Sequence, residues 1–537
     1  MVRPSRLLLI PVAVIATACA SGAPHTAPSP VPTPPSGVSR TFARAPVPTA
    51  NPKLPPVPEV DGPLQIKVAY PPEGALISSR DSNFVFGSVG NGTAGLTING
   101  DLVPVWPNGA FMGWVPNPPV PTQWYDLVAY TATDTARVRY AVRTRAAIPP
   151  RAPVQPQVTT VSPAAAAVLV SDPAANVASN AVSDTDNVVI GRPTPAGTYR
   201  WFLFPGTPVR VTEYRDDMAR VELDAAQQVW VARSNVKVVP GSAPAAPLRL
   251  SQPTLSATPG ELNLELHVAE PPAYLVDEGE RTITLTLYNI AQGADSVSSM
   301  SDPLLSGITQ SRSGSGVTYR FDLTRPVYGY LVTYRDGVLK FSIRRPPTVD
   351  VTAPLRGMII VVDPGHPPIG ATGPTGLWEP VPTLAVGLRV RDLLEQKGAH
   401  VVMTRTTADP VALGDRPIIA RRADANALVS IHLNADADGN NPFRSNGTGT
   451  YYFHPQSKLL ATDIQHTLVP ELGLRDRGVI FQNLALARPT WFPAVLAEGL
   501  FIIMPDQEAA IRTPQYQEAY AVGIVNGVER FFSGFAQ

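Results

Sequence analysis

The pattern of apolar residues changes near residue 357, and this change constrains the fold more than any other feature of the chain. An unbroken apolar run, MIIVV, begins at Met358 and predicts a strand buried on both faces, as in a parallel sheet covered by helices. The next segment, residues 383–396, carries leucines at helical spacing and is followed by Gly398, a residue type that commonly ends helices. Strands and helices continue to alternate to the end of the chain. Their order predicts a wound α/β domain over residues 355–535, with a sheet of about six strands flanked by helices.

Three residues of this domain have the types and the positions expected of metal ligands. His366 ends the run VVDPGH, Glu379 lies in the glycine-rich segment GATGPTGLWEP, and His432 lies in SIHLNA. Both histidines follow predicted strands whose carboxyl ends meet at one edge of the sheet, where ligands bind in open α/β sheets. Two imidazoles and one carboxylate leave the fourth position of a zinc ion open for water, so we expect a Zn²⁺ cofactor here. Glu498, at the end of AVLAEG, reaches the same edge and is the expected proton carrier.

These motifs resemble those of the zinc-dependent N-acetylmuramoyl-L-alanine amidases, and the resemblance covers about residue 356 to the end of the chain. It implies the fold of that family and a peptidoglycan substrate, in which the amide bond between N-acetylmuramic acid and L-alanine is hydrolysed. Matched by position, it also implies the roles of four residues: His366, Glu379 and His432 as metal ligands, and Glu498 as the catalytic glutamate.

Two positions depart from the family pattern. The family has a glycine two residues after the catalytic glutamate, whereas here Gly499 follows it immediately and Leu500 takes the family's position. Thr383 stands where the family often has asparagine. We expect altered contacts around an intact metal site.

Other interpretations of these residues remain open. Glu508 is an alternative proton carrier to Glu498, and Arg405 and Arg416 are expected to hold carboxylates within the fold, without a catalytic role. The domain could also be a catalytically degenerate adaptor that binds the cell wall, or a zinc peptidase or deacetylase acting on murein. Metal content and the identity of the products distinguish these hypotheses.

The rest of the chain predicts a series of β modules separated by spacers. With 537 residues the chain exceeds one hydrophobic core, and its 60 prolines and 40 glycines are unevenly spread. Short alternating runs predict three all-β modules, which resemble in turn an immunoglobulin-like sandwich, a small Src-homology-three-like barrel and the AMIN modules that dock amidases onto murein. Their ranges are 63–147, 185–240 and 247–350, with an Ala/Pro linker at 148–184.

The N-terminus predicts export. Arg3 and Arg6 precede an apolar run and then small residues, so residues 1–18 have the pattern of a signal peptide. The only cysteine of the chain, Cys19, follows Ala-Thr-Ala and resembles the lipidated residue of a bacterial lipobox; ordinary cleavage nearby and an uncleaved anchor are the alternatives. Residues 19–62 are rich in Pro, Ala, Ser and Thr and predict a tether. We therefore expect a protein of the cell envelope or periplasm that is anchored to a membrane through a lipid.

The charge of the chain excludes one class of partner. It has 43 basic and 43 acidic residues and a formal net charge of zero, which gives no electrostatic basis for binding nucleic acid. The expected partners are peptidoglycan, a membrane through the lipid anchor and, as a further candidate, a regulatory protein.

Overall fold

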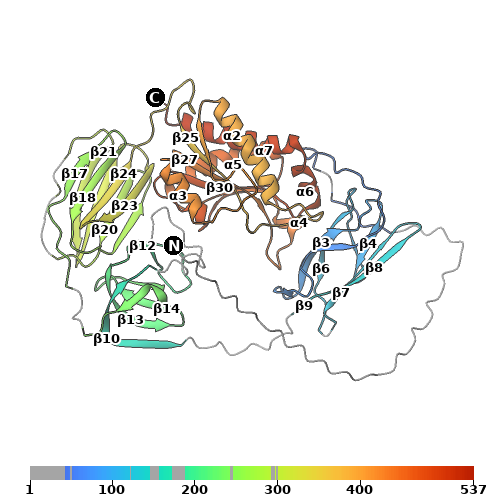
Figure 1. Ribbon diagram of the computed structural model, residues 1–537, viewed down its shortest axis with the longest axis horizontal. Coiled ribbons are helices and arrows are strands. Elements are labelled where there is room, and N and C mark those ends of the chain that lie inside the picture. The colour runs from blue at the N-terminus through green and yellow to red at the C-terminus, as the bar shows by residue number, and fades with distance from the viewer. Residues whose placement is uncertain are drawn as a thin grey trace, which may run out of the picture. The chain divides into compact units, whose positions relative to one another are not determined.

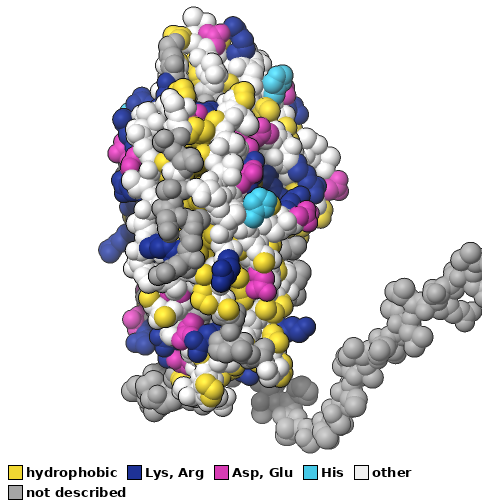
Figure 2. Space-filling model, turned by 90° about the vertical axis from the view of Figure 1, so that its left-hand side faces the viewer, with side chains coloured by type: hydrophobic (Ala, Val, Ile, Leu, Met, Phe, Trp, Pro, Cys, Tyr) yellow, Lys and Arg dark blue, Asp and Glu magenta, His cyan; other side chains and the backbone are white. Residues whose placement is uncertain are grey.

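The computed structural model describes residues 43–48, 51–120, 122–144, 157–171, 188–241, 246–291, 297 and 300–536 (Figure 1). The predicted signal peptide, Cys19 and most of the predicted tether lie outside these residues. Within them, no helix has both the length and the apolar character needed to span a membrane. On the face shown in Figure 2, basic and acidic side chains are interspersed, in agreement with their equal numbers in the sequence.

The first β region forms two main antiparallel sheets around one apolar core. Their strand orders are β1-β3-β6 and β5-β4-β7-β8, and β2 pairs with β9 in parallel. Phe111, Tyr125 and Leu127 are fully buried in this core. The strands are β1 Lys67–Tyr70, β2 Leu76–Ile77, β3 Ser82–Ser88, β4 Gly95–Ile98, β5 Asp101–Val103, β6 Ala110–Pro116, β7 Trp124–Tyr130, β8 Thr135–Ala141 and β9 Arg143–Thr144.

The second β region contains a five-stranded sheet, β15-β14-β13-β10-β16, and the pair β11-β12. Its longest strand, β10, falls inside the stretch that the sequence predicts to be an Ala/Pro linker. Val158 and the two threonines after it have branched side chains that favour strands, and Leu169 is fully buried at the other end. The elements are β10 Val158–Leu169, β11 Val189–Gly191, β12 Trp201–Leu203, β13 Pro208–Arg215, β14 Met218–Glu222, β15 Gln228–Ala232, the 3₁₀ turn η1 Arg233–Asn235 and β16 Val236–Val238.

The third β region consists of two four-stranded antiparallel sheets, β17-β18-β24-β23 and β19-β20-β22-β21. Alternate residues of their strands, among them Leu264, Leu285 and Phe341, are buried in a common core. The strands are β17 Thr254–Ala257, β18 Glu261–His267, β19 Tyr274–Glu278, β20 Thr282–Leu287, β21 Leu305–Ser313, β22 Gly316–Leu323, β23 Gly329–Arg335 and β24 Val338–Arg344.

The C-terminal domain, orange and red in Figure 1, is built on a six-stranded mixed sheet of order β26-β25-β27-β30-β28-β29. The neighbouring strands are parallel except for β28 and β30, which are antiparallel. The strands are β25 Ile359–Pro364, β26 His400–Met403, β27 Ala427–Asn434, β28 Thr448–Tyr452, β29 Asp476–Phe481 and β30 Ala494–Phe501. The helices are α2 Pro380–Gln396, α3 Asp415–Arg422, α4 Pro442–Ser445, α5 Lys458–Leu472, α6 Pro505–Ile511 and α7 Pro514–Ser533, with 3₁₀ turns η2 Pro455–Ser457 and η3 Ala485–Ala487.

Both faces of this sheet are covered, which explains its continuous apolar strands. On one face Ile360 and Val362 pack with side chains of α2, α5 and α7. On the other face Val361 packs with Ala420 of α3 and Leu486 of η3. Successive residues of one strand therefore enter two different cores, and the run MIIVV is buried as predicted except for Ile359, which is half-buried.

The prediction of a C-terminal α/β domain with about six strands, preceded by β-rich modules, is confirmed. Two details differ from the prediction. Helix α2 begins at Pro380, earlier than the leucine spacing indicates, because proline is well suited to the first turn of a helix. The segment GVIFQNLALA, residues 478–487, predicts a single strand from its apolar residues, but β29 ends at Phe481 and part of the remaining segment forms the turn η3.

Candidate metal centre and active site

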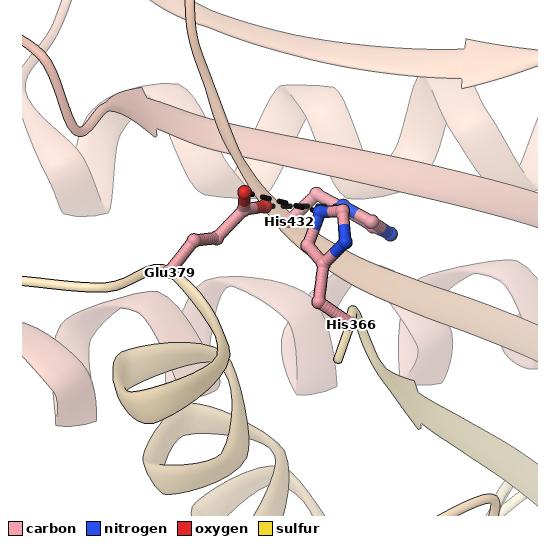
Figure 3. Close-up of side chains that lie close together, drawn as sticks. All are labelled: His366, Glu379 and His432. Carbon is pink, nitrogen blue, oxygen red and sulfur yellow. Dashed lines mark hydrogen bonds and ion pairs between the residues drawn. The ribbon is translucent and has the colours of Figure 1, made fainter. Parts of the chain in front are cut away.

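The structure brings His366, Glu379 and His432 together at one end of the sheet (Figure 3). His366 lies two residues beyond β25, His432 lies near the end of β27, and Glu379 immediately precedes α2. One potential ligand atom from each residue lies within 4.8 Å of the other two. Residues separated by 66 positions in the sequence thus form one compact donor set.

The Glu379 carboxylate is the centre of this group. Its Oε2 lies 3.1 Å from Nε2 of His366, and its Oε1 lies 3.1 Å from Nδ1 of His432. The backbone amides of Ala371 and Leu433 donate hydrogen bonds to the same two oxygens, at 2.9 and 3.0 Å. Burial opposes ionisation of this side chain, but the hydrogen bonds with the two imidazoles hold the pKa of Glu379 well below its ordinary value. The carboxylate is therefore both oriented and charged.

The donor spacing fits a tetrahedral metal ion. Two ligands that each lie about 2.0–2.1 Å from zinc are about 3.3 Å apart in a tetrahedron. The two nitrogen-to-oxygen distances of 3.1 Å are close to that separation. These two distances involve different oxygens of Glu379, and the ligand atoms of all three residues lie within 4.8 Å of one another, so the donor set has the chemistry and the approximate size for such an ion.

His432 fits against the backbone only because residue 365 is glycine. A Cβ atom on Gly365 would lie 2.5 Å from Cε1 and 2.6 Å from Nε2 of His432. Carbon and nitrogen atoms do not approach so closely, so any larger residue at this position would displace the imidazole ring. The glycine of the motif VVDPGH is thus required by the second histidine.

The aspartate of the same motif anchors the loop that carries His366. Asp363 is fully buried and forms an ion pair of 2.8 Å with Nη1 of Arg416, and it also accepts hydrogen bonds from Thr404 and Ser430. Burial opposes ionisation of Asp363, but the charge of Arg416 lowers its pKa below the ordinary value. Arg416 in turn donates to the carbonyl oxygens of Pro364, His366 and Pro367. This network fixes the backbone on both sides of the first histidine.

Two more side chains tie this loop to the start of α2. Arg405 donates to the carbonyl oxygens of Pro364 and Gly365 and to Thr383 Oγ1. Thr383 donates to Gly365 O at 2.9 Å. The expectation that arginines hold carboxylates is therefore correct for Arg416 and wrong for Arg405, whose partners in the described part of the chain are carbonyl and hydroxyl oxygens.

Glu498 lies on β30 directly opposite His432 of the neighbouring strand β27. Its Oε2 is buried and has no hydrogen-bond partner among the described residues. Burial raises the pKa of Glu498 above its ordinary value, an effect opposed by the charges of His432 and Arg477. An unpaired carboxyl with a raised pKa, next to the donor set, is suited to accept and release a proton near neutral pH.

The carboxylate of Glu508, the alternative proton carrier, is hydrogen-bonded to the glycine-rich segment. Glu508 is fully buried, and its carboxylate accepts hydrogen bonds from the backbone amides of Thr375 and Leu377. A Cβ atom on Gly373 would lie 2.6 Å from this carboxylate, so the glycine-rich segment is closely wrapped around it. Glu508 therefore shapes the loop that leads to Glu379, and its carboxylate is occupied by that loop and by Arg512.

Sequence reasoning missed Tyr520 of α7, which supports the two strands of the site from behind. Its hydroxyl accepts a hydrogen bond from Gly499 N at 2.8 Å and lies within 3.0 Å of the carbonyl oxygens of His432 and Ala497. A Cβ atom on Gly499 would lie 2.4 Å from the tyrosine ring. Gly499 is therefore the residue that lets α7 approach β30 beside Glu498.

Comparison with known proteins identifies the domain that carries this site. A family model described as N-acetylmuramoyl-L-alanine amidase matches residues 360–530. The uncharacterized protein YqiI of Bacillus subtilis is 33% identical over 192 residues, which are 35% of this chain and 90% of that protein. The chain belongs to the N-acetylmuramoyl-L-alanine amidase family.

Two further relatives of this amidase carry functional names. The protein named Probable cell wall amidase LytH of Staphylococcus epidermidis is 33% identical over 184 residues, which are 34% of this chain and 60% of that relative. The match therefore spans about 60% of the length of LytH. A crystal structure of N-acetylmuramoyl-L-alanine amidase from Clostridium difficile 630 is 34% identical and covers 32% of this chain and 95% of that chain, with a TM-score of 0.31.

The family resemblance seen in the sequence is thus confirmed, and both departures from its pattern have a structural setting in this amidase. Thr383 donates a hydrogen bond to Gly365 O and accepts one from Arg405, so it joins the loop of the first histidine to α2. Gly499 receives the ring of Tyr520. Neither substitution disturbs the convergence of the three donor residues.

Proposed function

We propose that this amidase is a zinc-dependent peptidoglycan hydrolase that cleaves the amide bond between N-acetylmuramic acid and L-alanine. The observation that carries the proposal is the meeting of His366, Glu379 and His432 within 4.8 Å, with the unpaired carboxyl of Glu498 on the adjacent strand. Family membership supports the class of bond, and the donor set supports the metal.

Four residues of the chain have distinct roles in the proposed reaction. His366, Glu379 and His432 would hold Zn²⁺, which supplies an activated water and polarises the amide carbonyl when it is bound. Glu498 accepts a proton from the attacking water while the oxygen bonds to the lactyl carbonyl carbon. The carbon–nitrogen bond then breaks, and Glu498 returns the proton to the amine of L-alanine. No covalent bond between protein and substrate is needed.

The position of Glu498 supports this role over a structural one. Asp363 and Glu508, two other buried carboxylates of this domain, are paired. Glu498 Oε2 instead lacks a partner in the described part of the chain, although leaving a buried polar atom unsatisfied costs about 1–3 kcal/mol. Such a cost is typical of a group kept free for catalysis.

The degenerate-adaptor hypothesis is less well supported than the hydrolase. A degenerate site loses ligands or the proton carrier, whereas all four residue types are present here and are close together. The hypothesis of a zinc peptidase or deacetylase shares this site and differs only in the bond that is cut.

Product analysis tests the proposal directly. The full chain, loaded with zinc, is incubated with purified sacculi, and the soluble products are analysed by mass spectrometry. We expect glycan with a free lactyl carboxylate and stem peptides that begin with alanine. Shortened peptides or deacetylated glycan would refute the assignment of the bond, and an absence of soluble products from zinc-loaded protein would favour the adaptor.

The location of the protein follows from the same proposal. An enzyme that acts on peptidoglycan works in the cell envelope, and the predicted signal peptide and the lipobox at Cys19 would place it there through a lipid anchor. We further propose that the three β regions are immunoglobulin-like, Src-homology-three-like and AMIN-like modules that hold the enzyme on the wall. Palmitate labelling of the wild type and of a Cys19→Ala variant tests the anchor: loss of label in the variant supports it, and equal labelling refutes it.

A further inference from the structure

Arg477 lies at an irregularity in the sheet, beside the active site. In the pairing of β28 with β29, Thr448 is opposite Asp476 and Gly449 is opposite Gly478, so Arg477 is an extra residue without a partner in the register. Gly478 has a φ of 81°, a conformation that side chains rarely adopt. Bulges of this kind re-aim a side chain and are frequent next to active sites.

The bulge directs Arg477 back across the sheet toward the catalytic glutamate. Its guanidinium carbon lies 5.0 Å from the ring centre of Phe501 on β30, and its Nη1 lies 3.4 Å from the hydroxyl of Tyr451 on β28. Its charge acts on Glu498 and on Asp436. The side chain thus starts on the outermost strand, β29, and ends over the strand that carries Glu498.

The guanidinium remains available to a ligand. Arg477 is partly exposed, and among the described residues no carboxylate oxygen lies within ion-pair distance of it. Asp436, the other acidic residue whose pKa it affects, accepts a hydrogen bond from Ser445 instead. A planar guanidinium with free donors matches a carboxylate, which it can bind through two parallel hydrogen bonds.

Two glycines lie in the sheet between Glu498 and the side chain of Arg477, and a Cβ atom on the nearer one, Gly449, would lie 3.6 Å from Cβ of Arg477. Across the sheet, His432 pairs with Glu498, Glu498 pairs with Gly449, and Gly449 pairs with Gly478. Paired residues face the same side of a sheet, so two glycines follow the catalytic glutamate on its own face. A Cβ atom on Gly478 would meet no atom within 4 Å.

The metal donors and Arg477 lie on opposite sides of Glu498. The metal donors lie on the β25 and β27 side of Glu498, and the glycines and Arg477 lie on the β28 and β29 side. Strand β28 lies between β30 and β29. Neighbouring strands are about 4.8 Å apart, so β30 and β29 are about 10 Å apart. An extended leaving peptide advances about 3.3 Å per residue. If it runs from Glu498 toward β29, its second residue comes within reach of Arg477, whose side chain extends from β29 toward β30.

We infer that Arg477 is a specificity-determining residue that binds a carboxylate on the second residue of the leaving peptide. The inference rests on the proposed function, because it takes Glu498 as the group that protonates the leaving amine and so marks the peptide side of the scissile bond. The ligand class is an acidic peptide, and the bound group is the free α-carboxylate of the residue that follows L-alanine.

The test compares two substrates that differ only in this group. The full chain, loaded with zinc, is given N-acetylmuramoyl-L-alanyl-γ-D-glutamyl-L-lysine with the glutamyl α-carboxylate either free or amidated. Wild type is compared with Arg477→Met, with the charge-retaining Arg477→Lys, and with Arg475→Met, a matched control at an exposed arginine two residues earlier. Calorimetric binding of the free product peptides supplies a readout that does not depend on turnover.

We expect the wild type to prefer the free acid by about tenfold or more in kcat/KM, since hydrogen bonds between charged groups are worth that much. Arg477→Met should abolish the preference by lowering kcat/KM for the acid alone, Arg477→Lys should retain part of it, and Arg475→Met should keep it. The affinity for the acidic product peptide should follow the same order among the wild type and the variants.

Two outcomes would overturn the inference while leaving the proposed function intact. One is equal cleavage of both substrates by the wild type. The other is an equal loss on both substrates in Arg477→Met, which would assign Arg477 to the reacting carbonyl or to Glu498. If the wild type cleaves neither substrate, the proposed function fails, and the calorimetric preference for the acidic product still decides the inference.

Discussion

Replacing Asp363 by asparagine should destabilise the catalytic domain by about 3–5 kcal/mol, the usual cost of removing one partner of a buried ion pair. Asp363 is 0% exposed and Arg416 is 3% exposed, so the arginine left behind could not recover its hydration. The asparagine is nearly isosteric, so the loss comes from the charge and not from a cavity. A change of 1.4 kcal/mol is a factor of ten, so the unfolded population should rise by roughly two to three and a half orders of magnitude.

Hydrogen exchange measured by mass spectrometry in increasing urea is the suitable assay, because it separates this domain from the β regions of the same chain. Peptides from β25 and β27 report the free energy of unfolding of the catalytic sheet. The control is Asp392→Asn, which removes an exposed ion pair with Arg391 on α2 and should cost no more than about 1 kcal/mol. A loss below about 1 kcal/mol in Asp363→Asn would refute the buried-pair argument.

The same pair predicts a dependence on pH. Burial opposes ionisation of Asp363, but Arg416 and the hydroxyls of Ser430 and Thr404 lower its pKa in the folded state. Below about pH 4 the unfolded chain takes up a proton that the folded chain still resists. The stabilisation from this residue is therefore complete above that pH and is lost as the pH falls further. The difference between wild type and Asp363→Asn should shrink as the pH falls below about 4, and a difference that stays constant would contradict the linkage.

Three further variants probe the site. His366→Ala should lose bound zinc and the rise in melting temperature that zinc gives the wild type, while the exposed control His400→Ala keeps both; a zinc-dependent rise in His366→Ala would argue against its role as a ligand. Glu498→Gln should retain a full complement of zinc by mass spectrometry but lower kcat on sacculi by about 10²–10⁴, and near-normal turnover would remove Glu498 from the mechanism. Tyr520→Phe leaves the buried amide of Gly499 without its acceptor and should cost about 1–3 kcal/mol by the exchange assay, whereas Tyr452→Phe on β28 should cost little; equal effects would disprove this account of Tyr520.

The grouping of the three donor residues could be predicted from the sequence because each of them has a local pattern around it. His366 and His432 come at the ends of apolar runs that indicate buried strands, and such strands end at one edge of the sheet. Glu379 follows a glycine-rich segment and precedes a proline, which together indicate the start of a helix. These three cues do not depend on contacts between distant parts of the chain.

Contacts across long stretches of sequence could not be predicted in this way. Glu508 binds amides that lie more than 130 residues earlier, and no motif marks it. Strand β10 looks like a spacer because its alanines form no alternating pattern; it is a strand because β13 and β16, far along the chain, pair with it. The bulge at Arg477 likewise appears only when β28 and β29 are in register.

The two backbone amides that hold the Glu379 carboxylate have a consequence for how the proposed zinc ion would bind. Fixing a free glutamate side chain costs about 1.5–2 kcal/mol in rotamer entropy, and here that ordering is complete once the chain has folded. An incoming ion meets an oxygen donor that already points toward it. Reloading of chelator-treated protein should therefore be limited by diffusion and dehydration of the ion, with a rate that is first order in metal and shows no slow rearrangement of the chain.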